Sequence, residues 1–539
     1  MERQLSLAKY IAAVLCLISA NSCTKDFPEI NSNPTQLTVT NFDPNALLTS
    51  VQLTYTGSTD FAFEAWRNNL GYCSLMIQLM ASTQFPGDKY LLDYTYSSSY
   101  WNRAYTEQVK PIVELFELTK DKPEHANLHQ ISRLMKAMVF QRISDLYGDV
   151  PYFEAGQAYH ERIFYPVYDK QSDIYPDLIK EIEEASAALD PAGDKPTGDA
   201  MFDGDIGKWK RFGYTLLLRA GMRLVKVNET MARETAAKAV NNTMTSISDN
   251  AFVNGSGTGV DRTVNNRNSQ ILLGDGGGGE HFYTKWSKTF IDFLKNNHDP
   301  RLTRIARTHV WATDIPTNIT QNANPDGSFE AQNGMPNGKN TSNVDDGNSI
   351  YYDPSYTGTV GDPGGLNNYS SVNLAMAQRT GPTFFLTYAE SELLLAEAAL
   401  RWGGAFGSPE DHYNNGINAA MSYLTQYDPS LEISAAEQIA YLEAHPYDPA
   451  KGMEMINTQY WATTGTSLNF YEAWSNWRRT GFPILTPVNY PGNNTNGTIP
   501  RRHLYPLEEG TSNEENLNAA RNAMPGGDQM TSRVWWDAE

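Results

Sequence analysis

Apolar residues recur at helical spacing through much of the first half of the chain. Between positions 128 and 147 they occupy one helical face, and Gly148 and Pro151, residue types that end helices, follow directly. That face consists of Leu128, Ile131, Met135, Met138, Val139 and Leu146. The segment 172–191 repeats the pattern through Leu178, Ile182, Ala185 and Leu189 and stops at Pro191. The pattern therefore predicts a mostly α-helical protein.

Two pairs of predicted helices are each separated by a short break. One pair covers 178–189 and 209–224, and the other covers 383–402 and 408–427. In the second pair, small residues lie opposite Leu and Tyr, which is typical of tetratricopeptide-type hairpins, although the spacing is not a clean 34-residue repeat. We therefore expect tetratricopeptide-like helical hairpins to form the scaffold.

Between 246 and 379 the character of the chain changes. Gly, Asn and Asp are dense there, and one predicted helix, 285–297, interrupts them. The C-terminal part mixes aromatic and arginine residues. Loops this long within a folded chain are usually functional or disordered. We predict a helical scaffold over about 46–245 and 380–425, long irregular loops over about 246–379 and 426–539, and a few short strands.

The N-terminus carries a short apolar run, at about 10–18, which Arg3 and Lys9 precede and Cys23 closely follows. The run is too short to cross a bilayer and has the length of a signal-peptide core. A cysteine directly after small residues is typical of a bacterial lipoprotein signal, in which the thiol is acylated, although Ala20 stands where leucine is more usual. Ordinary signal cleavage beside an incidental cysteine is the alternative. We predict a lipoprotein signal peptide at 1–22, a lipidated tether at 23–45 and a single domain at 46–539.

Composition and charge narrow the classes of partner. The 62 acidic and 42 basic residues give a net charge of −20. Nucleic acids and anionic membrane surfaces bind through basic patches, so this balance disfavours both and favours a neutral ligand. The 12% aromatic content excludes a disordered chain. Once a leader containing Cys16 is removed, Cys23 and Cys73 remain, which are too few for a disulfide framework, and apolar neighbours predict that Cys73 is buried.

Catalytic signatures are mostly absent. The glycine-rich run at 274–279 lacks the lysine and hydroxyl of a phosphate-binding loop, and no G-x-S-x-G or H-E-x-x-H motif occurs. Glu390 and Glu397 share a helical face, but capping or pairing with arginine suits a packed helix better than paired-carboxylate catalysis. We predict that the protein is not an enzyme and needs no cofactor. Acidic stretches at 275–280 and 343–348 leave a structural calcium ion open, without EF-hand spacing.

Histidines and paired arginines admit a binding interpretation as well as a structural one. His125 and His129 lie one helical turn apart, but a zinc site needs further ligands that no neighbour supplies. The double arginines at 478–479 and 501–502 have the geometry to grip an anion. Arginines in such aromatic surroundings more often stack on rings as structural cations, and we favour that interpretation.

Aromatic loops are the strongest functional signal. The stretches 82–98 and 345–369 combine Tyr and Phe rings with Asn and Asp. Sugar rings present apolar C–H faces that stack on aromatic rings, while amides and carboxylates bond their hydroxyls. The alternative is that these rings anchor the loops onto the scaffold.

Several stretches, in this order, give the chain a family resemblance: "YWNRAYTE", "RISDLYGDVPYFEA", "WKRFGYTLLLRAGMRL", "FFLTYAESELLLAEAALRWG", "EAWSNWRRTGFP" and "IPRRHLYPLEE". Together they span nearly the whole chain. It resembles the SusD/RagB family of nutrient-binding outer-membrane lipoproteins of Bacteroidetes. The resemblance implies a mostly α-helical SusD-like fold that acts as a hinged lid on a SusC-like TonB-dependent transporter and delivers an oligosaccharide to it.

The resemblance also implies where the ligand lies. One contribution comes from the loop before "YWNRAYTE", here Phe85, Tyr90 and Tyr94, and a second from loops around "DPRL", here Phe282, Tyr283 and Trp311. The aromatic loop 345–369 adds Tyr351 and Tyr352. An oligopeptide ligand is the alternative within this architecture, and a surface glycoside hydrolase is a further one.

The resemblance places the protein at the outer membrane, anchored through Cys23. Export to the cell surface in this group of bacteria is associated with a short acidic or lysine-acidic signal after the cysteine. Here Thr24, Lys25 and Asp26 follow it, with a single acidic residue. We expect the protein to face the cell exterior.

Overall fold

The computed structural model describes residues 42–59, 63–257, 265–272, 280–311 and 321–539. Asn45–Glu539 form one compact unit. Cys23 and the predicted signal peptide lie outside the described residues, so the lipid anchor stays a prediction. Within the described residues, no helix is both long enough and apolar enough to cross a membrane.

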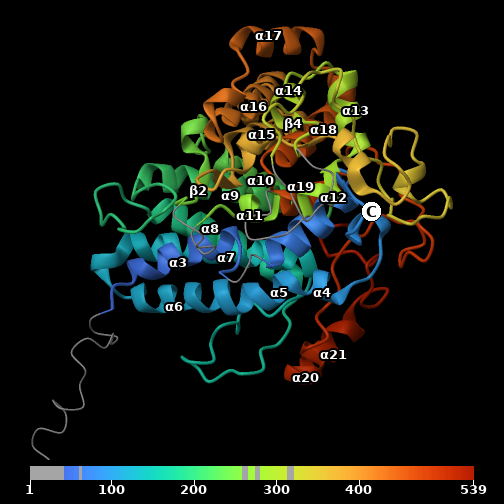
Figure 1. Ribbon diagram of the computed structural model, residues 1–539. Coiled ribbons are helices and arrows are strands. Elements are labelled where there is room, and N and C mark those ends of the chain that lie inside the picture. The colour runs from blue at the N-terminus through green and yellow to red at the C-terminus, as the bar shows by residue number, and fades with distance from the viewer. Residues whose placement is uncertain (1–41, 60–62, 258–264, 273–279, 312–320) are drawn as a thin grey trace, which may run out of the picture. The chain divides into compact units, whose positions relative to one another are not determined.

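Helices dominate the described part of the domain (Figure 1). The first half of the chain forms α3 (Asn45–Thr56), α4 (Tyr94–Ser97), α5 (Ser99–Arg103), α6 (Lys110–Thr119), α7 (Ala126–Tyr147), α8 (Gln171–Ala188), α9 (Ile206–Arg223), α10 (Glu229–Ala239) and the π-helical η1 (Ala65–Ser74) and η3 (Ala104–Val109). The second half forms α11 (Arg267–Leu272), α12 (Glu280–Tyr283), α13 (Lys288–Asn296), α14 (Leu302–Ile305), α15 (Tyr388–Trp402), α16 (Pro409–Ser422), α17 (Ala435–Ala444), α18 (Gly452–Thr466), α19 (Phe470–Thr480), α20 (Glu509–Ser512) and α21 (Glu514–Ala523). The predicted fold class, mostly α, is confirmed.

The strands are short and join segments that are distant in sequence. β1 (Met80–Ser82) pairs antiparallel with β3 (Thr284–Trp286), β2 (Ala251–Asn254) with β6 (Pro382–Leu386), and β4 (Ala306–Arg307) with β5 (Ser371–Val372). β2 lies near the start of the loop-rich region, and β6 directly follows that region. Their pairing therefore brings the two ends of the region together beside the helical scaffold.

The predicted helical hairpins are present. α7, α8, α9 and α10 pack against one another in chain order, and α15 packs against α16 (Figure 1). At Gly213 on α9, an added Cβ would overlap the Ser186 hydroxyl on α8, and at Gly416 on α16 it would lie 2.7 Å from the Leu393 side chain on α15. Small residues thus let both pairs of helices approach closely.

The expectation that 426–539 is loop-rich was wrong for α18 and α19, which belong to the core. Trp461 on α18 and Trp474 on α19 expose 2% and 0% of their surface. α18 is buried on every side from Ile456 to Thr466 apart from a few half-buried positions, so it lacks the polar face that reveals a helix in a sequence. The predicted helix at 285–297 begins later, because 284–286 form β3 and Ser287 caps α13.

A buried layer of ion pairs joins the central helices. Arg479 on α19 bonds Glu397 on α15 through both terminal nitrogens, at 2.7 and 2.6 Å. Arg223 on α9 bonds Glu472 on α19 at 2.6 Å and Asp145 on α7 at 3.3 Å. The expected pairing of Glu397 with arginine is therefore confirmed. Of the 478–479 pair, Arg478 stacks on the Trp474 ring at 4.0 Å as expected, whereas Arg479 is held by a carboxylate.

Glu390 is a second buried glutamate on α15, and it caps the helix. Its Oε2 accepts the Thr387 N–H at 3.0 Å, and the Thr387 hydroxyl accepts the Glu390 N–H at 3.2 Å, which makes a capping box. Burial, reinforced by the nearby Glu472 carboxylate and opposed by Arg219, raises the pKa of Glu390 to about 7. The folded protein thus holds a proton that the unfolded chain releases above its ordinary pKa of 4.5, so this group makes the protein less stable as the pH rises from 4.5 to 7.

We expect Glu390→Gln to raise the free energy of unfolding by about 3 kcal/mol at pH 8 and to change it little at pH 4, since a shift of one pKa unit corresponds to about 1.4 kcal/mol. Glutamine also serves in a capping box. Urea titrations at both pH values measure the effect. The matched control is Glu437→Gln, because Glu437 caps α17 in the same way with Ser434 but its side chain is 39% exposed; a gain as large in this control would contradict the role given to burial.

Candidate functional site

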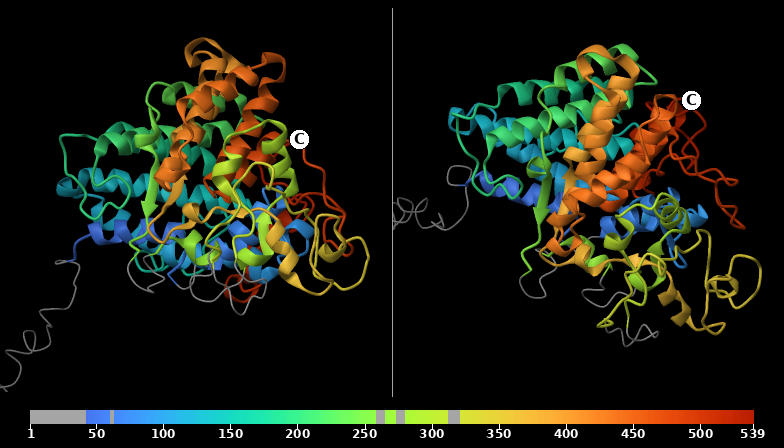
Figure 2. Two further views of the ribbon diagram at one scale, coloured as in Figure 1. Left: turned by 45° about the horizontal axis from the view of Figure 1, so that its top comes forward. Right: turned by 90° about the horizontal axis from the view of Figure 1, so that it is seen from above.

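Aromatic side chains from the loop-rich region form a second buried cluster, separate from the main core. This loop cluster comprises Ala81, Phe282, Val310, Trp311, Met335, Ile350, Tyr356, Leu366 and Tyr369, with Tyr283, Tyr351 and Leu374 packed against it. Figure 2 shows the segment 321–370, yellow-green to yellow, on the side of the domain away from α8 and α9. The cluster is the small core around which the loops on that side are built.

The β1–β3 pair brings two of the predicted aromatic stretches together. Ser82 pairs with Thr284, and their hydroxyls lie 3.1 Å apart. The Thr83 N–H donates to the Tyr283 carbonyl at 3.2 Å. The start of the 82–98 loop therefore lies beside 280–284, as a shared ligand-binding face requires.

A buried ion pair fixes the conformation of the 82–90 loop. The Lys89 ammonium bonds Asp88 at 3.0 Å and the carbonyls of Ser82 and Phe85 at 2.7 and 2.8 Å. The second oxygen of Asp88 accepts the N–H groups of Ser82 and Gly338, at 3.1 and 3.3 Å. Both charges are satisfied without water, so this loop is held to the 336–340 segment as one rigid unit.

Half of the rings that were predicted to contact the ligand are buried. Phe85, Tyr90, Phe282 and Trp311 expose at most 4% of their surface. The Tyr90 hydroxyl accepts the Val488 N–H at 3.1 Å, and the Trp311 carbonyl accepts a bond from the Asn367 side chain at 2.8 Å. In this arrangement these rings hold the loops in place, and their contact with a ligand stays a prediction.

The other predicted rings retain accessible surface. Tyr94, Tyr283 and Tyr351 are half-buried, and Tyr352 is 42% exposed. Burial raises the pKa of the Tyr283 and Tyr351 hydroxyls above the usual value, so these groups lie where water reaches them poorly. A polar group in such a position gains more from a ligand hydrogen bond than one in open solvent.

Tyr351 and Tyr352 lie on a well-anchored turn. The 3-10 turn η7 (Ile350–Tyr352) is capped by the Ser349 hydroxyl, which accepts the Tyr351 N–H at 3.2 Å. The Tyr351 ring packs edge-on against Tyr356 with 5.4 Å between centroids. The Tyr352 hydroxyl donates to the Asn343 carbonyl at 3.1 Å. The turn therefore presents the Tyr352 ring on a fixed backbone among exposed polar residues.

A polar groove of about 460 Å³ begins next to this turn. Gly347 and Asn348, which precede the cap Ser349, line it together with residues of α13 and the segments 336–339 and 486–489. Amide and hydroxyl groups such as Asn337, Asn348 and Thr289 predominate among its polar side chains. This groove could not be predicted from the sequence, because its lining comes from five separate parts of the chain, Gln78 among them, without a motif.

Among the described residues, no group of three or more His, Cys, Asp or Glu side chains is arranged to hold a metal ion. The stretch 275–280, one of those considered for calcium, lies almost wholly outside the described residues. The His129 ring instead lies 4.9 Å from the Phe116 ring and 3.1 Å from the Thr119 hydroxyl, as an ordinary packed histidine does.

A family model and two solved structures that match this chain carry a binding function in their descriptions. Residues 34–506 match a family model described as starch-binding and associating with the outer membrane. A solved chitin-binding protein is 30% identical, with a TM-score of 0.77 over 92% of this chain and 100% of that one. A SusD-like protein described as Bacteroidetes AC2a is 24% identical, with a TM-score of 0.79 over 92% and 100% of the chains. A chitin-binding SusD homologue from Flavobacterium johnsoniae is 19% identical, with a TM-score of 0.71 over 92% and 99%. No curated protein matches the chain.

Proposed function

This chain belongs to the SusD-like family, and on that basis we propose that it is an outer-membrane lipoprotein that binds chitin-type oligosaccharides and passes them to a transporter. The observation that carries the choice of ligand is the 30% identity to a chitin-binding protein over 92% of this chain and all of that one. The family is one of binding proteins, and the protein is proposed to capture its ligand without cleaving it.

The proposed ligand site is the exposed side of the loop cluster together with the polar groove. Tyr283, Tyr351 and Tyr352 supply accessible ring surface there, and the groove supplies amides and hydroxyls. Tyr94, which packs against the main core, is proposed as a further half-buried ring of the site. An amphipathic sugar needs both kinds of group, since binding sites combine apolar surface with a few placed polar groups. The net charge of −20 agrees with a neutral ligand.

The proposed anchor is Cys23, acylated after removal of 1–22, with the tether 23–45 joining it to the domain. A single acyl chain binds membranes only marginally, and several chains give stable attachment. The proposed partner is a SusC-like TonB-dependent transporter, on which the domain acts as a lid. A tether would keep the domain beside the transporter and leave it free to open and close.

Calorimetric titration of the purified protein tests the ligand class. We expect binding of N-acetylglucosamine oligomers and none of peptides of similar length. Peptide binding without glycan binding would overturn the proposal in favour of an oligopeptide carrier. Shorter sugars accumulating during the titration would establish a glycoside hydrolase instead.

Within this site, Tyr352→Ala is expected to weaken glycan binding about fivefold, because an aromatic contact contributes about 1 kcal/mol and tenfold in affinity corresponds to about 1.4 kcal/mol. The matched control is Tyr159→Ala. Tyr159 is 78% exposed and lies between α7 and α8, outside the loop cluster. Equal affinities of the Tyr352 variant and the unaltered protein would remove this ring from the site.

A further inference from the structure

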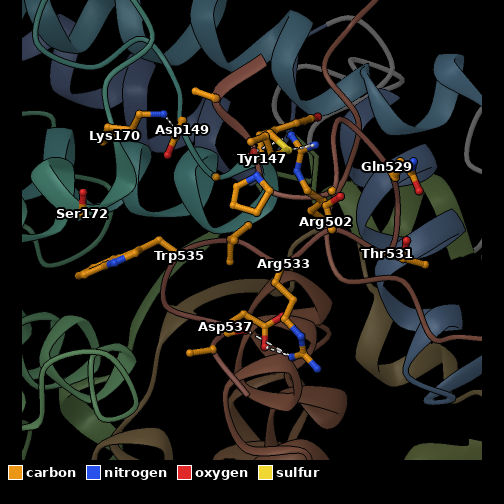
Figure 3. A pocket seen from close by; sticks show the side chains of 18 residues that line it. Tyr147, Asp149, Lys170, Ser172, Arg502, Gln529, Thr531, Arg533, Trp535 and Asp537 are labelled. Atoms are coloured by element: carbon orange, nitrogen blue, oxygen red, sulfur yellow. Dashed lines mark hydrogen bonds and ion pairs between the residues drawn. The ribbon is translucent and has the colours of Figure 1, made fainter. Parts of the chain in front are cut away.

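A pocket of about 710 Å³ opens beside the C-terminal end of α7 (Figure 3). Its lining comes from 147–149, 170–172, Arg502 and the C-terminal segment 523–538, so it shares no residue with the loop cluster or the polar groove. In Figure 3, Lys170 and Ser172 lie on one side of the pocket, and Gln529 and Thr531 lie on the other. A pocket of this volume is in the range that encloses most of a small ligand.

One wall of the pocket is held to α7 by a buried arginine. Arg502 donates to Asp528 at 2.6 Å and to the Tyr147 carbonyl, at the end of α7, at 2.8 Å. Arg521 bonds the second oxygen of Asp528 at 3.0 Å. These bonds fix the segment 523–532 relative to α7, so this side of the pocket exists before any ligand arrives.

The opposite wall is formed where α8 begins. The Lys170 ammonium bonds Asp149 at 2.7 Å, and the other oxygen of Asp149 accepts the Gln171 N–H at 2.9 Å. These bonds join Asp149, two residues after the end of α7, to the start of α8. Ser172, in the first turn of α8, lines the pocket and is half-buried.

Trp535 offers a ring to the pocket from a fixed backbone. Its neighbour Trp536 is fully buried and donates from its indole to Asp145 at 2.9 Å. The next residue, Asp537, is fully buried and accepts from Arg501 at 2.7 Å. Trp535 itself is only half-buried. A ring whose backbone is fixed by the anchored residues that follow it loses little conformational entropy when a ligand stacks on it.

Each cation on the lining has a carboxylate partner, on the lining itself or, for Asp528, just outside it. Lys170 pairs with Asp149 at 2.7 Å, Arg533 with Asp537 at 3.0 Å, and Arg502 with Asp528 at 2.6 Å. A phosphate or carboxylate ligand would have to compete with these carboxylates. The pocket therefore suits a ligand that carries no net charge but has many hydrogen-bonding groups, and Ser172, Gln529 and Thr531 supply neutral partners for them.

We propose that this pocket is a second carbohydrate-binding site, which takes a neutral oligosaccharide of two or three sugar units with one ring stacked on Trp535. The class of ligand follows from the pocket's own aromatic face, its polar rim and the pairing of its cations with carboxylates. Only the choice of a chitin-type probe rests on the proposed function. A second site lets one molecule hold a long glycan at two places, which raises the overall affinity through effective concentration.

The test is calorimetric titration of the full chain with N-acetylglucosamine trisaccharide. We expect two sites in the unaltered protein, and at least tenfold weaker binding at one of them in Trp535→Ala. Ala523→Trp fills the pocket from an exposed alanine of its lining and removes no contact. It is expected to weaken binding at the same site, and it tests the proposal if Trp535→Ala does not fold. The control is Asn522→Trp, one residue earlier, exposed and outside the lining.

The outcomes separate this proposal from the proposed function. A single site that Tyr352→Ala weakens, and that neither Trp535→Ala nor Ala523→Trp affects, overturns the second site and leaves the proposed function standing. A single site that the Trp535 and Ala523 variants remove, with Tyr352→Ala unchanged, supports the pocket and overturns the loop-cluster site. Absence of glycan binding overturns both.

Discussion

Replacing Glu397 with glutamine is expected to lower the free energy of unfolding by about 3–5 kcal/mol at pH 7, because the change leaves a buried arginine without its counter-charge. Glu397 is fully buried and receives bonds from Arg479 at 2.7 and 2.6 Å, from Arg401 at 2.8 Å and from Asn457 at 3.2 Å. Glutamine has the same shape and keeps some of these bonds, so the measured loss reports mainly the missing charge.

In acid, the free energy of unfolding of Glu397→Gln is expected to approach that of the unaltered protein. Burial alone would raise the pKa of Glu397, but Arg479 and then Arg401 outweigh burial and hold the pKa at about 2. The unfolded chain titrates near 4.5. The ionised group therefore contributes stability that is fully present above pH 4.5 and is lost as the pH falls from 4.5 to 2. Urea titrations at pH 7 and pH 3 should show the difference between variant and unaltered protein shrinking by about 1.4 kcal/mol per pH unit in that window.

The control for Glu397 is a glutamate whose ion pair is accessible to solvent. Glu183 bonds Lys238 at 2.8 Å, with 34% and 53% of the two side chains exposed. Glu183→Gln is expected to cost less than about 1 kcal/mol, as surface ion pairs usually do. Similar losses in both variants, or a loss in Glu397→Gln that does not depend on pH, would contradict the account of a buried, charge-dependent contact.

The helical scaffold was predictable from the sequence because its signals are local. The apolar face between 128 and 147 ends at Tyr147, where α7 ends, and Gly148 takes the positive φ of 87° that ends it. The roles of Glu390 as a cap and Glu397 as an arginine partner also followed from their place on one helix. α18 was missed because a helix buried on nearly all sides lacks the alternation of apolar and polar faces.

The orientation of aromatic rings was not predictable in the same way. The loop at 82–98 and the connection at 153–167 are both rich in rings, yet Phe85 and Tyr90 are buried whereas Phe164 and Tyr165 expose 67% and 69% of their surface. The local sequence does not distinguish a loop ring that packs inward from one that faces solvent. The difference arises from distant partners, such as the Val488 N–H that bonds the Tyr90 hydroxyl.

The two proposed ligand sites could not be predicted from the sequence either. The polar groove and the pocket at the end of α7 each combine segments that are far apart in sequence. Trp535 stands beside Trp536 in the sequence, but one ring lines a pocket and the other is fully buried. Only the anchors that hold the C-terminal segment, Asp145 and Arg501, decide which ring is accessible.

Lys285→Met is expected to raise the free energy of unfolding by about 2 kcal/mol or more at pH 7, since replacing a buried charge by a side chain of similar volume is often stabilising. Lys285 lies on β3 beside the loop cluster and is fully buried. In the described part of the chain its ammonium bonds the Ser371 hydroxyl at 2.7 Å and lies 5.7 Å from the Phe282 ring centre, and no carboxylate pairs with it. Burial lowers its pKa from 10.5 to about 7.

The pH dependence gives this prediction a second readout. The unfolded chain holds a proton on Lys285 up to about pH 10.5, whereas the folded protein releases it near pH 7. The buried group therefore destabilises the protein most at and below pH 7, and this penalty disappears as the pH rises from 7 to 10.5. The advantage of Lys285→Met should shrink over the same range. The control is Lys89→Met: Lys89 is buried too, but it bonds Asp88 at 3.0 Å, so its loss should cost about 3–5 kcal/mol by leaving that carboxylate unpaired. A loss of stability in Lys285→Met would show that the ammonium has a stabilising partner in the folded protein. A gain that persists unchanged at pH 10 would show that the buried charge is not its cause.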